Sequence, residues 1–224
     1  MPPADTRPRT PSAKGPRIEV LIAAYDEAPR VARVVAAARD ADVGPVLVVD
    51  DGSRDRTADV VVAAGARVVR LPHNVGKGGA LHAGATASDA DLLVLLDADL
   101  EGFAPAHVHA LLRPVLEGRA ASTRGVFRGA RAATTSAQRL APGLGGQRVV
   151  PRDALLAVPD LASARFGVEV ALERTLRRRG APPTDVALDG VGQVMKEEKR
   201  GFVAGVRARL AMYADVLRAI ARRA

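Results

Sequence analysis

The stretch that decides the fold is Leu92-Leu93-Val94-Leu95-Leu96-Asp97-Ala98-Asp99, in which five apolar residues end in two aspartates separated by one alanine. A run this short and this apolar predicts a strand that is buried on both faces of a parallel sheet. Residues just after such a strand lie at the carboxyl edge of the sheet, where open α/β folds hold their ligands. Two carboxylates there suit Mg²⁺ or Mn²⁺, which would bind the phosphates of a nucleotide. The alternative is a loop in which one aspartate caps the following helix and the other faces water.

Strands and helices alternate along the chain before this stretch. Further strands are expected at Ile18–Ala24, Val46–Val49 and Arg67–Leu71. Helices are expected to begin at Pro29 and Thr57 and to run over Ala80–Ala87, with residues 72–79 as a loop. This alternation predicts βαβ units with right-handed crossovers. The predicted fold class is therefore α/β, a Rossmann-like single domain with a mainly parallel central sheet.

The pattern is less regular after Asp99. Helices are expected at 105–116, at 152–158 and from 166 or 167 to 179. Strands are expected at 120–127, 147–150 and 184–188, and the strand at 120–127 is expected at a sheet edge. Residues 129–146 are rich in Ala, Thr and Gly and are expected to form a mobile lid. The predicted organisation is a disordered basic tail at 1–17, one domain at 18–200 and an amphipathic helix at 201–224.

Composition and charge exclude several classes of protein. The 224 residues include no cysteine, which excludes disulfides, thiolate zinc sites and cysteine nucleophiles. Of the net charge of +8, residues 1–17 carry +3 and residues 196–224 carry +5, so residues 18–195 sum to zero. A neutral core domain argues against a nucleic-acid groove, which needs a basic face. Without an apolar run of membrane-spanning length or a signal segment, a cytoplasmic protein is the simplest interpretation.

Acidic residues follow three of the four predicted parallel strands. Asp26 and Glu27 come after the first strand, residues 50–51 after the second, and Asp97 and Asp99 after the fourth. The carboxyl ends of parallel strands share one edge of the sheet, so these acids are expected on a common rim. Their mutual repulsion calls for a cation or hydrogen-bond donors among them. The glycine-rich loop at 74–79, with Lys77 between glycines, is suited to a phosphate, although a solvated surface loop would look the same.

Four motifs, in this order and spacing over residues 18–101, resemble those of the family 2 glycosyltransferases, which have a GT-A fold. They are Ala24-Tyr25-Asp26-Glu27, Val49-Asp50-Asp51-Gly52-Ser53, Asn74-Val75-Gly76-Lys77-Gly78 and Leu96-Asp97-Ala98-Asp99. The similarity extends to dolichyl-phosphate mannose synthases and glucosyl-3-phosphoglycerate synthases. The segments 145–148, 166–169 and 190–199 are more loosely similar to the acceptor half of such enzymes.

The resemblance implies a transferase that moves a sugar from a UDP- or GDP-sugar, bound by residues 18–101, to an acceptor bound by residues 102–200. The base and ribose would be held by Ala24, Tyr25 and Glu27. By the same resemblance, Asp51 would accept the imide hydrogen of the base, and Gly76 and Lys77 would lie near the base or the diphosphate. The acceptor is unidentified; a phosphorylated small molecule and a lipid phosphate both fit.

The resemblance also implies a bound Mg²⁺ or Mn²⁺ ion. Asp99 would bind the metal directly, and Asp97 would lie near the ribose and the sugar. Relatives often carry His where this chain has Gln193, and that His completes the metal shell; Gln offers only a neutral amide oxygen. The predicted metal ligands are therefore Asp99, Asp97 and Gln193, and the ion would neutralise the charge of the departing nucleoside diphosphate.

Glu169 is the predicted general base, because an inverting transfer needs a carboxylate to take the proton of the acceptor hydroxyl. An acid in the first turn of a helix also stabilises that helix, which is the alternative role of Glu169. A phosphorylated acceptor would need no base. Arg148 is suited to recognising an anionic acceptor, or to pairing with an acid on the surface.

The last predicted helix, at about 202–222, carries an apolar seam. Val203, Val206, Leu210, Tyr213, Leu217 and Ile220 recur at alternating steps of three and four, with arginines off the seam. Docking on its own domain is the simplest interpretation. A homodimer seam, or a basic amphipathic helix resting peripherally on the inner, anionic face of a membrane, are the alternatives.

Two other functions compete with sugar transfer. A sugar-phosphate nucleotidyltransferase would favour a Gly-rich loop with Arg or Lys straight after the first strand, where this chain has Tyr25-Asp26-Glu27. A non-catalytic nucleotide-sugar-binding protein, degenerate at Gln193, is the second competitor. Sugar transfer accounts for all four motifs and is the preferred prediction.

Overall fold

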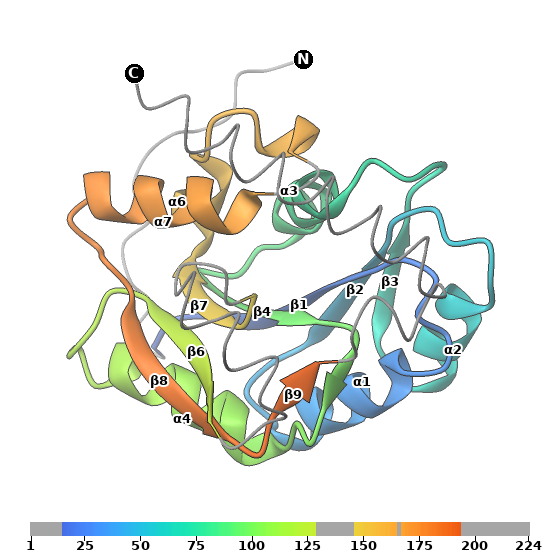
Figure 1. Ribbon diagram of the computed structural model, residues 1–224, viewed down its shortest axis with the longest axis horizontal. Coiled ribbons are helices and arrows are strands. Elements are labelled where there is room, and N and C mark those ends of the chain that lie inside the picture. Colours follow the sequence, from blue (N-terminus) through green and yellow to red (C-terminus); the bar gives the residue numbers. More distant parts are fainter. Residues whose placement is uncertain (1–14, 129–145, 165–166, 194–224) are drawn as a thin grey trace.

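The fold is an α/β sandwich built on one seven-stranded sheet (Figure 1). The computed structural model describes residues 15–128, 146–164 and 167–193. The strand order is β3-β2-β1-β4-β7-β6-β8. The strands are β1 (Ile18–Ala24), β2 (Val46–Asp50), β3 (Arg67–Arg70), β4 (Leu92–Asp97), β6 (Thr123–Arg128), β7 (Arg148–Pro151) and β8 (Thr184–Asp189). A second sheet pairs β5 (Leu100–Glu101) with β9 (Gly192–Gln193).

The helices cover both faces of the large sheet, one set on each side (Figure 1). One face packs against α1 (Val31–Asp40), α2 (Thr57–Ala63) and α4 (Pro105–Leu116). The other packs against α3 (Lys77–Ala87), α6 (Arg152–Leu156), η2 (Leu161–Ser163) and α7 (Val168–Arg178). No described helix is long and apolar enough to cross a membrane.

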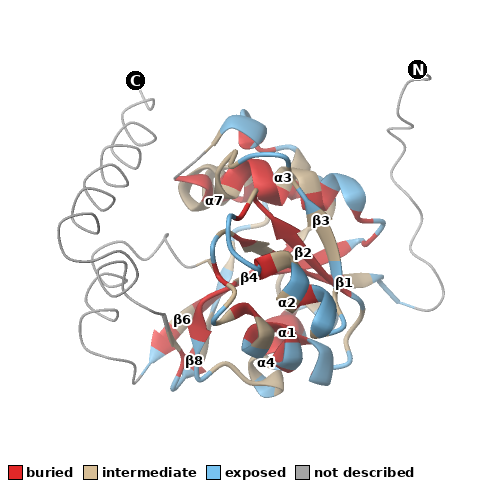
Figure 2. Cartoon of the chain, turned by 90° about the vertical axis from the view of Figure 1, so that its right-hand side faces the viewer, coloured by how far each residue is buried: buried red, intermediate tan, exposed pale blue. Residues whose placement is uncertain are grey.

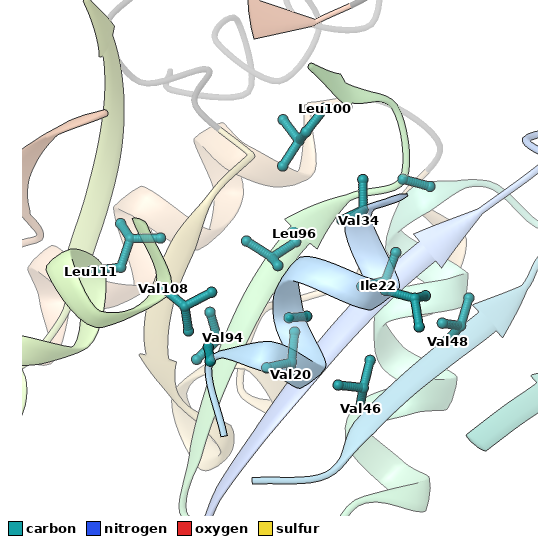
Figure 3. Packing of buried hydrophobic residues seen from close by; sticks show 14 of the residues in the cluster. Val20, Ile22, Val34, Val46, Val48, Val94, Leu96, Leu100, Val108 and Leu111 are labelled. Atoms are coloured by element: carbon teal, nitrogen blue, oxygen red, sulfur yellow. The ribbon is translucent and has the colours of Figure 1, made fainter. Parts of the chain in front are cut away.

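The strand of the opening motif lies at the centre of this sandwich. Leu92 to Leu96 are buried, and successive side chains alternate between the two core clusters, with Val94 and Leu96 on the face of α1 and α4 (Figure 3). Leu93 and Leu95 join the cluster on the face of α3 and α7. Figure 2 shows the same burial along the central strands. The prediction of a strand buried on both faces is confirmed, and so is the mainly parallel α/β class: β4 pairs with β1 in parallel and with β7 antiparallel.

Several predicted boundaries differ from the structure. Helix α1 begins at Val31 rather than Pro29, because residues 27–30 form a turn in which the Arg30 and Val31 amides both donate to the Glu27 carbonyl. Helix α3 begins at Lys77, three residues before the predicted Ala80, since the glycines there fit a tightly packed helix start. Strand β6 is not at an edge: it lies between β7 and β8.

Some predictions fall largely on residues that the structure does not describe. Three predicted segments lie outside the described ranges: the 1–17 tail except its last three residues, the 129–146 loop except Gly146, and the whole 201–224 helix. The domain boundaries therefore stay predictions. The small β5–β9 sheet was not predicted, since two-residue strands carry no periodicity for sequence analysis to detect.

Candidate donor-binding and metal site

The parallel register of the sheet brings the acidic motifs to one edge. Ala24 at the end of β1 pairs with Asp50, and Ala23 pairs with Asp97, so β1, β2 and β4 end side by side. The common rim predicted from the sequence is confirmed by this register. The glycine-rich loop joins the same edge, because α3 follows β3 and packs over β1 and β2.

Lys77 is the centre of a charged cluster on this edge. Its Nζ donates to Asp97 Oδ1 and to Glu169 Oε1, both at 2.7 Å. Burial by itself would lower the pKa of the Lys77 ammonium, but the two carboxylates outweigh it and hold that pKa above the usual lysine range. Lys77 is therefore a stabilised cation that joins the end of β4 to the first turn of α7.

Two further groups fix Asp97 from the opposite side. Gln147 Nε2 donates to Asp97 Oδ2 at 2.8 Å. A Cβ placed on Gly146 would lie only 2.3 Å from the same oxygen, so the Asp97 carboxylate packs directly on the Gly146 backbone. Both Asp97 oxygens thus accept hydrogen bonds from protein donors.

The glycine-rich segment is shaped by close packing at the start of α3. Gly76, just before the helix, has φ +93°, a conformation that side chains disfavour. The Gly78 amide donates to the Ala164 carbonyl at 2.8 Å, and a Cβ there would lie 2.3 Å from that oxygen. Lys77 is placed beside Asp97 and Glu169 by this docking of α3 on η2.

Asp51 anchors the loop that leads to Lys77. Its carboxylate accepts hydrogen bonds from Asn74 Nδ2 at 2.8 Å, the Val75 amide at 2.8 Å and the Gly76 amide at 2.9 Å. Asp51 is 3% exposed, and its own amide donates to the Ala24 carbonyl. The structure thus gives Asp51 a positioning role in the loop, while its contact with a base stays a prediction.

The segment after β1 is held by the segment after β2. Asp26 has φ +53°, which Asn and Asp tolerate better than most residues, and its carboxylate accepts from the Arg54 amide. The Tyr25 hydroxyl accepts from Arg54 Nη2 at 3.0 Å, and the Glu27 amide donates to Thr57 Oγ1 at 2.9 Å. The predicted nucleoside contacts Tyr25 and Glu27 are therefore held against the start of α2 and the segment before it, and Ala24 precedes them as the last residue of β1.

The second aspartate of the motif is buried beside the small second sheet. Asp99 is 8% exposed and directly precedes β5, in which Leu100 pairs with Gln193 of β9. The backbone of Gln193 is therefore next to the motif, while its role as a metal ligand stays a prediction. No three His, Cys, Asp or Glu side chains in the described ranges converge on one point. A divalent ion held by one or two carboxylates and by substrate phosphates fits this donor set.

Arg148 is more deeply buried than expected for a side chain that recognises an acceptor at the surface. It is 1% exposed, and its Nη1 donates to Glu173 Oε2 at 3.1 Å, an oxygen that Arg124 Nη1 contacts at 3.3 Å. Burial lowers the pKa of the Arg148 guanidinium, and the Glu173 hydrogen bond offsets part of this effect. In this structure Arg148 is an internal partner of α7, and anion binding stays a prediction.

Comparison with known proteins assigns the family. The family model for glycosyl transferase family 2 matches residues 19–169, and the chain belongs to this family. The family resemblance noted in the motifs is thereby confirmed.

Curated relatives match the chain over shorter segments. The glucosyl-3-phosphoglycerate synthase of Mycolicibacterium paratuberculosis is 37% identical over 114 residues, covering 46% of this chain and 35% of the relative. A dolichyl-phosphate beta-glucosyltransferase of Trichomonas vaginalis is 42% identical over 59 residues, 24% of this chain and 18% of the relative. The matched part thus spans about a third or less of the length of these relatives.

Solved structures match over most of the fold. Glucosyl-3-phosphoglycerate synthase from Mycobacterium tuberculosis, in complex with Mn²⁺, UDP and glucosyl-3-phosphoglycerate, superimposes with a TM-score of 0.73 at 27% identity. The match covers 94% of this chain and 80% of that chain. The same enzyme in complex with Mg²⁺ and UDP gives a TM-score of 0.73 at 26% identity, with the same coverage.

Proposed function

We propose that this chain transfers a sugar from a nucleotide sugar to an acceptor oxygen with the help of Mg²⁺ or Mn²⁺. The observation that carries the proposal is the cluster at the carboxyl edge, where Lys77 joins Asp97 to Glu169 and Asp99 follows two residues after Asp97. Structural neighbours crystallised with UDP and Mn²⁺ or Mg²⁺ favour UDP over GDP as the carrier.

The chemistry follows from the groups on this edge. An acceptor oxygen attacks the anomeric carbon of the sugar, the bond from that carbon to the diphosphate oxygen breaks, and the nucleoside diphosphate leaves with the bonding electrons. A bound divalent ion would neutralise the charge that develops on the diphosphate. Lys77 adds a fixed cation near the same atoms, Asp97 holds Lys77 in place, and Glu169 is proposed to take the proton of an acceptor hydroxyl.

The acceptor is proposed to carry a phosphate. The structural neighbours include complexes with phosphoglyceric acid, and the curated relatives include transferases named for dolichyl phosphate and undecaprenyl phosphate. A phosphorylated acceptor needs no base only where a phosphate oxygen itself attacks, as in a lipid phosphate, because that oxygen is already ionised. A small phosphorylated hydroxy acid attacks through its hydroxyl and still needs a base. The two sources differ in whether Glu169 is needed as a base.

Transfer from radiolabelled UDP-glucose tests the proposal. The purified chain is incubated with Mn²⁺ and either 3-phosphoglycerate or a polyprenyl phosphate in detergent, beside Asp99→Ala and the surface control Asp59→Ala. We expect product from one acceptor, loss of product in Asp99→Ala, and full activity in Asp59→Ala, which lies on α2 and pairs only with Arg56 in the described structure. Nucleotide binding without any product would instead favour the non-catalytic binder.

A further inference from the structure

Gln147 is the buried residue of the edge cluster to which no role has yet been given. It directly precedes β7, and Arg148, the next residue, pairs with Leu95 of β4, so Gln147 faces the end of the strand that carries Asp97. The Gln147 carbonyl accepts from the Gly125 amide at 2.8 Å, which fixes its backbone between β4 and β6. The side chain is 1% exposed.

The orientation of the Gln147 amide follows from its partner. An ionised carboxylate only accepts hydrogen bonds, so the NH₂ end must face Asp97 Oδ2, to which it donates at 2.8 Å. The amide oxygen is then left on the other side, where it has no hydrogen-bond partner in the described structure. An unmade hydrogen bond at a buried acceptor is unfavourable, and Met or Leu would fill the space without that penalty.

The two donors on Asp97 differ in a way that matters for a site that binds a metal and a diphosphate. Lys77 is charged and is shared with Glu169, so an arriving diphosphate competes for it. Gln147 is neutral, so it holds Asp97 Oδ2 while reducing the attraction of that carboxylate for a cation less than a second cation would. The backbone of Gly146 closes the same side of the carboxylate, so Asp97 can turn only away from Gly146.

We propose that Gln147 is a positioning residue of the donor site: its Nε2 fixes the Asp97 carboxylate in the orientation that receives the nucleotide sugar. The assignment of Gln147 to a donor site rests on the proposed function, but the coupling of Gln147 to Asp97 is independent of that function. The positioning acts through Asp97 and requires no contact between Gln147 and the substrate.

Two variants and a matched control test this coupling. Gln147→Met keeps the volume and removes the donor, and Gln147→Glu replaces the donor by a carboxyl group of the same shape. Ser122→Ala is the control, because it removes the hydrogen bond of another buried side chain, from Ser122 Oγ to the Ala181 carbonyl, just before β6 begins. UDP binding with Mn²⁺ is measured by calorimetry from pH 5 to pH 8, with thermal unfolding of each protein recorded.

We expect Gln147→Met to bind UDP about tenfold more weakly than wild type at every pH, as for one lost hydrogen bond to a charged group. Gln147→Glu should bind worse still at pH 8, where the two carboxylates repel, and should approach wild type as the pH falls and they share a proton. Ser122→Ala should bind as wild type does. Wild-type affinity in both Gln147 variants across the range would overturn the inference.

A ligand-free crystal structure of Gln147→Met separates this inference from the proposed function. If wild type fails to bind UDP, the proposed function is contradicted, and the structure alone decides the coupling. We expect the Asp97 side chain to turn away from its wild-type position in that variant. An Asp97 carboxylate that stays in place would overturn the positioning role regardless of activity.

Discussion

Lys77 Nζ donates to Asp97 Oδ1 at 2.7 Å, which ties the first residue of α3 to the last residue of β4. One ion pair therefore joins the start of α3, which follows β3, to the end of β4, although β2 and β1 lie between these two strands in the sheet. Glu169 is the third member of the pair. Removal of the cation would leave two carboxylates facing each other without a counter-charge, which is more unfavourable than loss of the pair itself.

The stability of the chain at alkaline pH should report this ion pair. The pKa of Lys77 is raised in the fold, so the folded state keeps its proton where the unfolded state loses it. The contribution to stability is complete below the unfolded lysine pKa near 10.5 and is lost as the pH rises toward the folded value. Urea unfolding between about pH 9.5 and 11.5 should show a shallower decline for Lys77→Met than for wild type. Identical slopes would mean that the pair is not formed.

Gly146→Ala should impair the site with little effect on the rest of the fold. The new Cβ would lie 2.3 Å from Asp97 Oδ2 and push the carboxylate aside, so we expect UDP-glucose turnover to fall by about tenfold or more. Gly118→Ala is the control: its Cβ meets nothing within 4 Å, although φ +68° makes the substitution strained. The control should lose stability and keep turnover. Full turnover in Gly146→Ala together with reduced turnover in Gly118→Ala would contradict the packing of Asp97 on Gly146.

Glu169→Gln distinguishes a base from a structural partner. The amide oxygen can still accept the Lys77 hydrogen bond, but it cannot take a proton from an acceptor hydroxyl. If Glu169 is the base, kcat should fall by about 10² to 10⁴ while UDP binding is kept. A loss of less than about tenfold would assign Glu169 to positioning Lys77 and would favour an acceptor that is already ionised.

Asp51→Ala should loosen the loop before Lys77. It removes three hydrogen bonds to a buried carboxylate, and roughly 3 kcal/mol of unfolding free energy should be lost. Asn74→Ala removes one of the three and should cost about 1 kcal/mol, which provides an internal scale. Chemical denaturation gives both values. Equal losses in the two variants would show that the backbone amides at 75 and 76 do not depend on Asp51.

Local pattern was sufficient to predict the donor half of the fold. Buried strands that alternate with helices apolar on one face indicate βαβ units. The parallel strands of such units are enough to place Asp51, Asp97 and Lys77 on one edge of the sheet. The contacts inside that edge could not be predicted in this way. Lys77 meets Glu169 across 92 residues, and Gln147 meets Asp97 across 50, through an antiparallel strand whose register no local pattern specifies.

The start of α3 shows the same limit at short range. Three glycines among four residues read as a loop, because glycine disfavours helix interiors. Packing reverses that preference, since Gly78 and Gly79 are the residues small enough to dock against the carbonyls of η2 and its flank. A tertiary contact thus extends the helix to Lys77 and aims its side chain at Asp97.

The central claim is that Asp99 holds a divalent ion that binds a nucleoside diphosphate. Calorimetry of UDP binding to wild type and Asp99→Ala, each with Mn²⁺ and with chelator, tests it most directly. We expect wild type to bind UDP at least tenfold more tightly with Mn²⁺ than with chelator, and Asp99→Ala to lose that difference. Wild-type binding that is indifferent to Mn²⁺, or an Asp99→Ala variant that keeps the full metal effect, would contradict the claim.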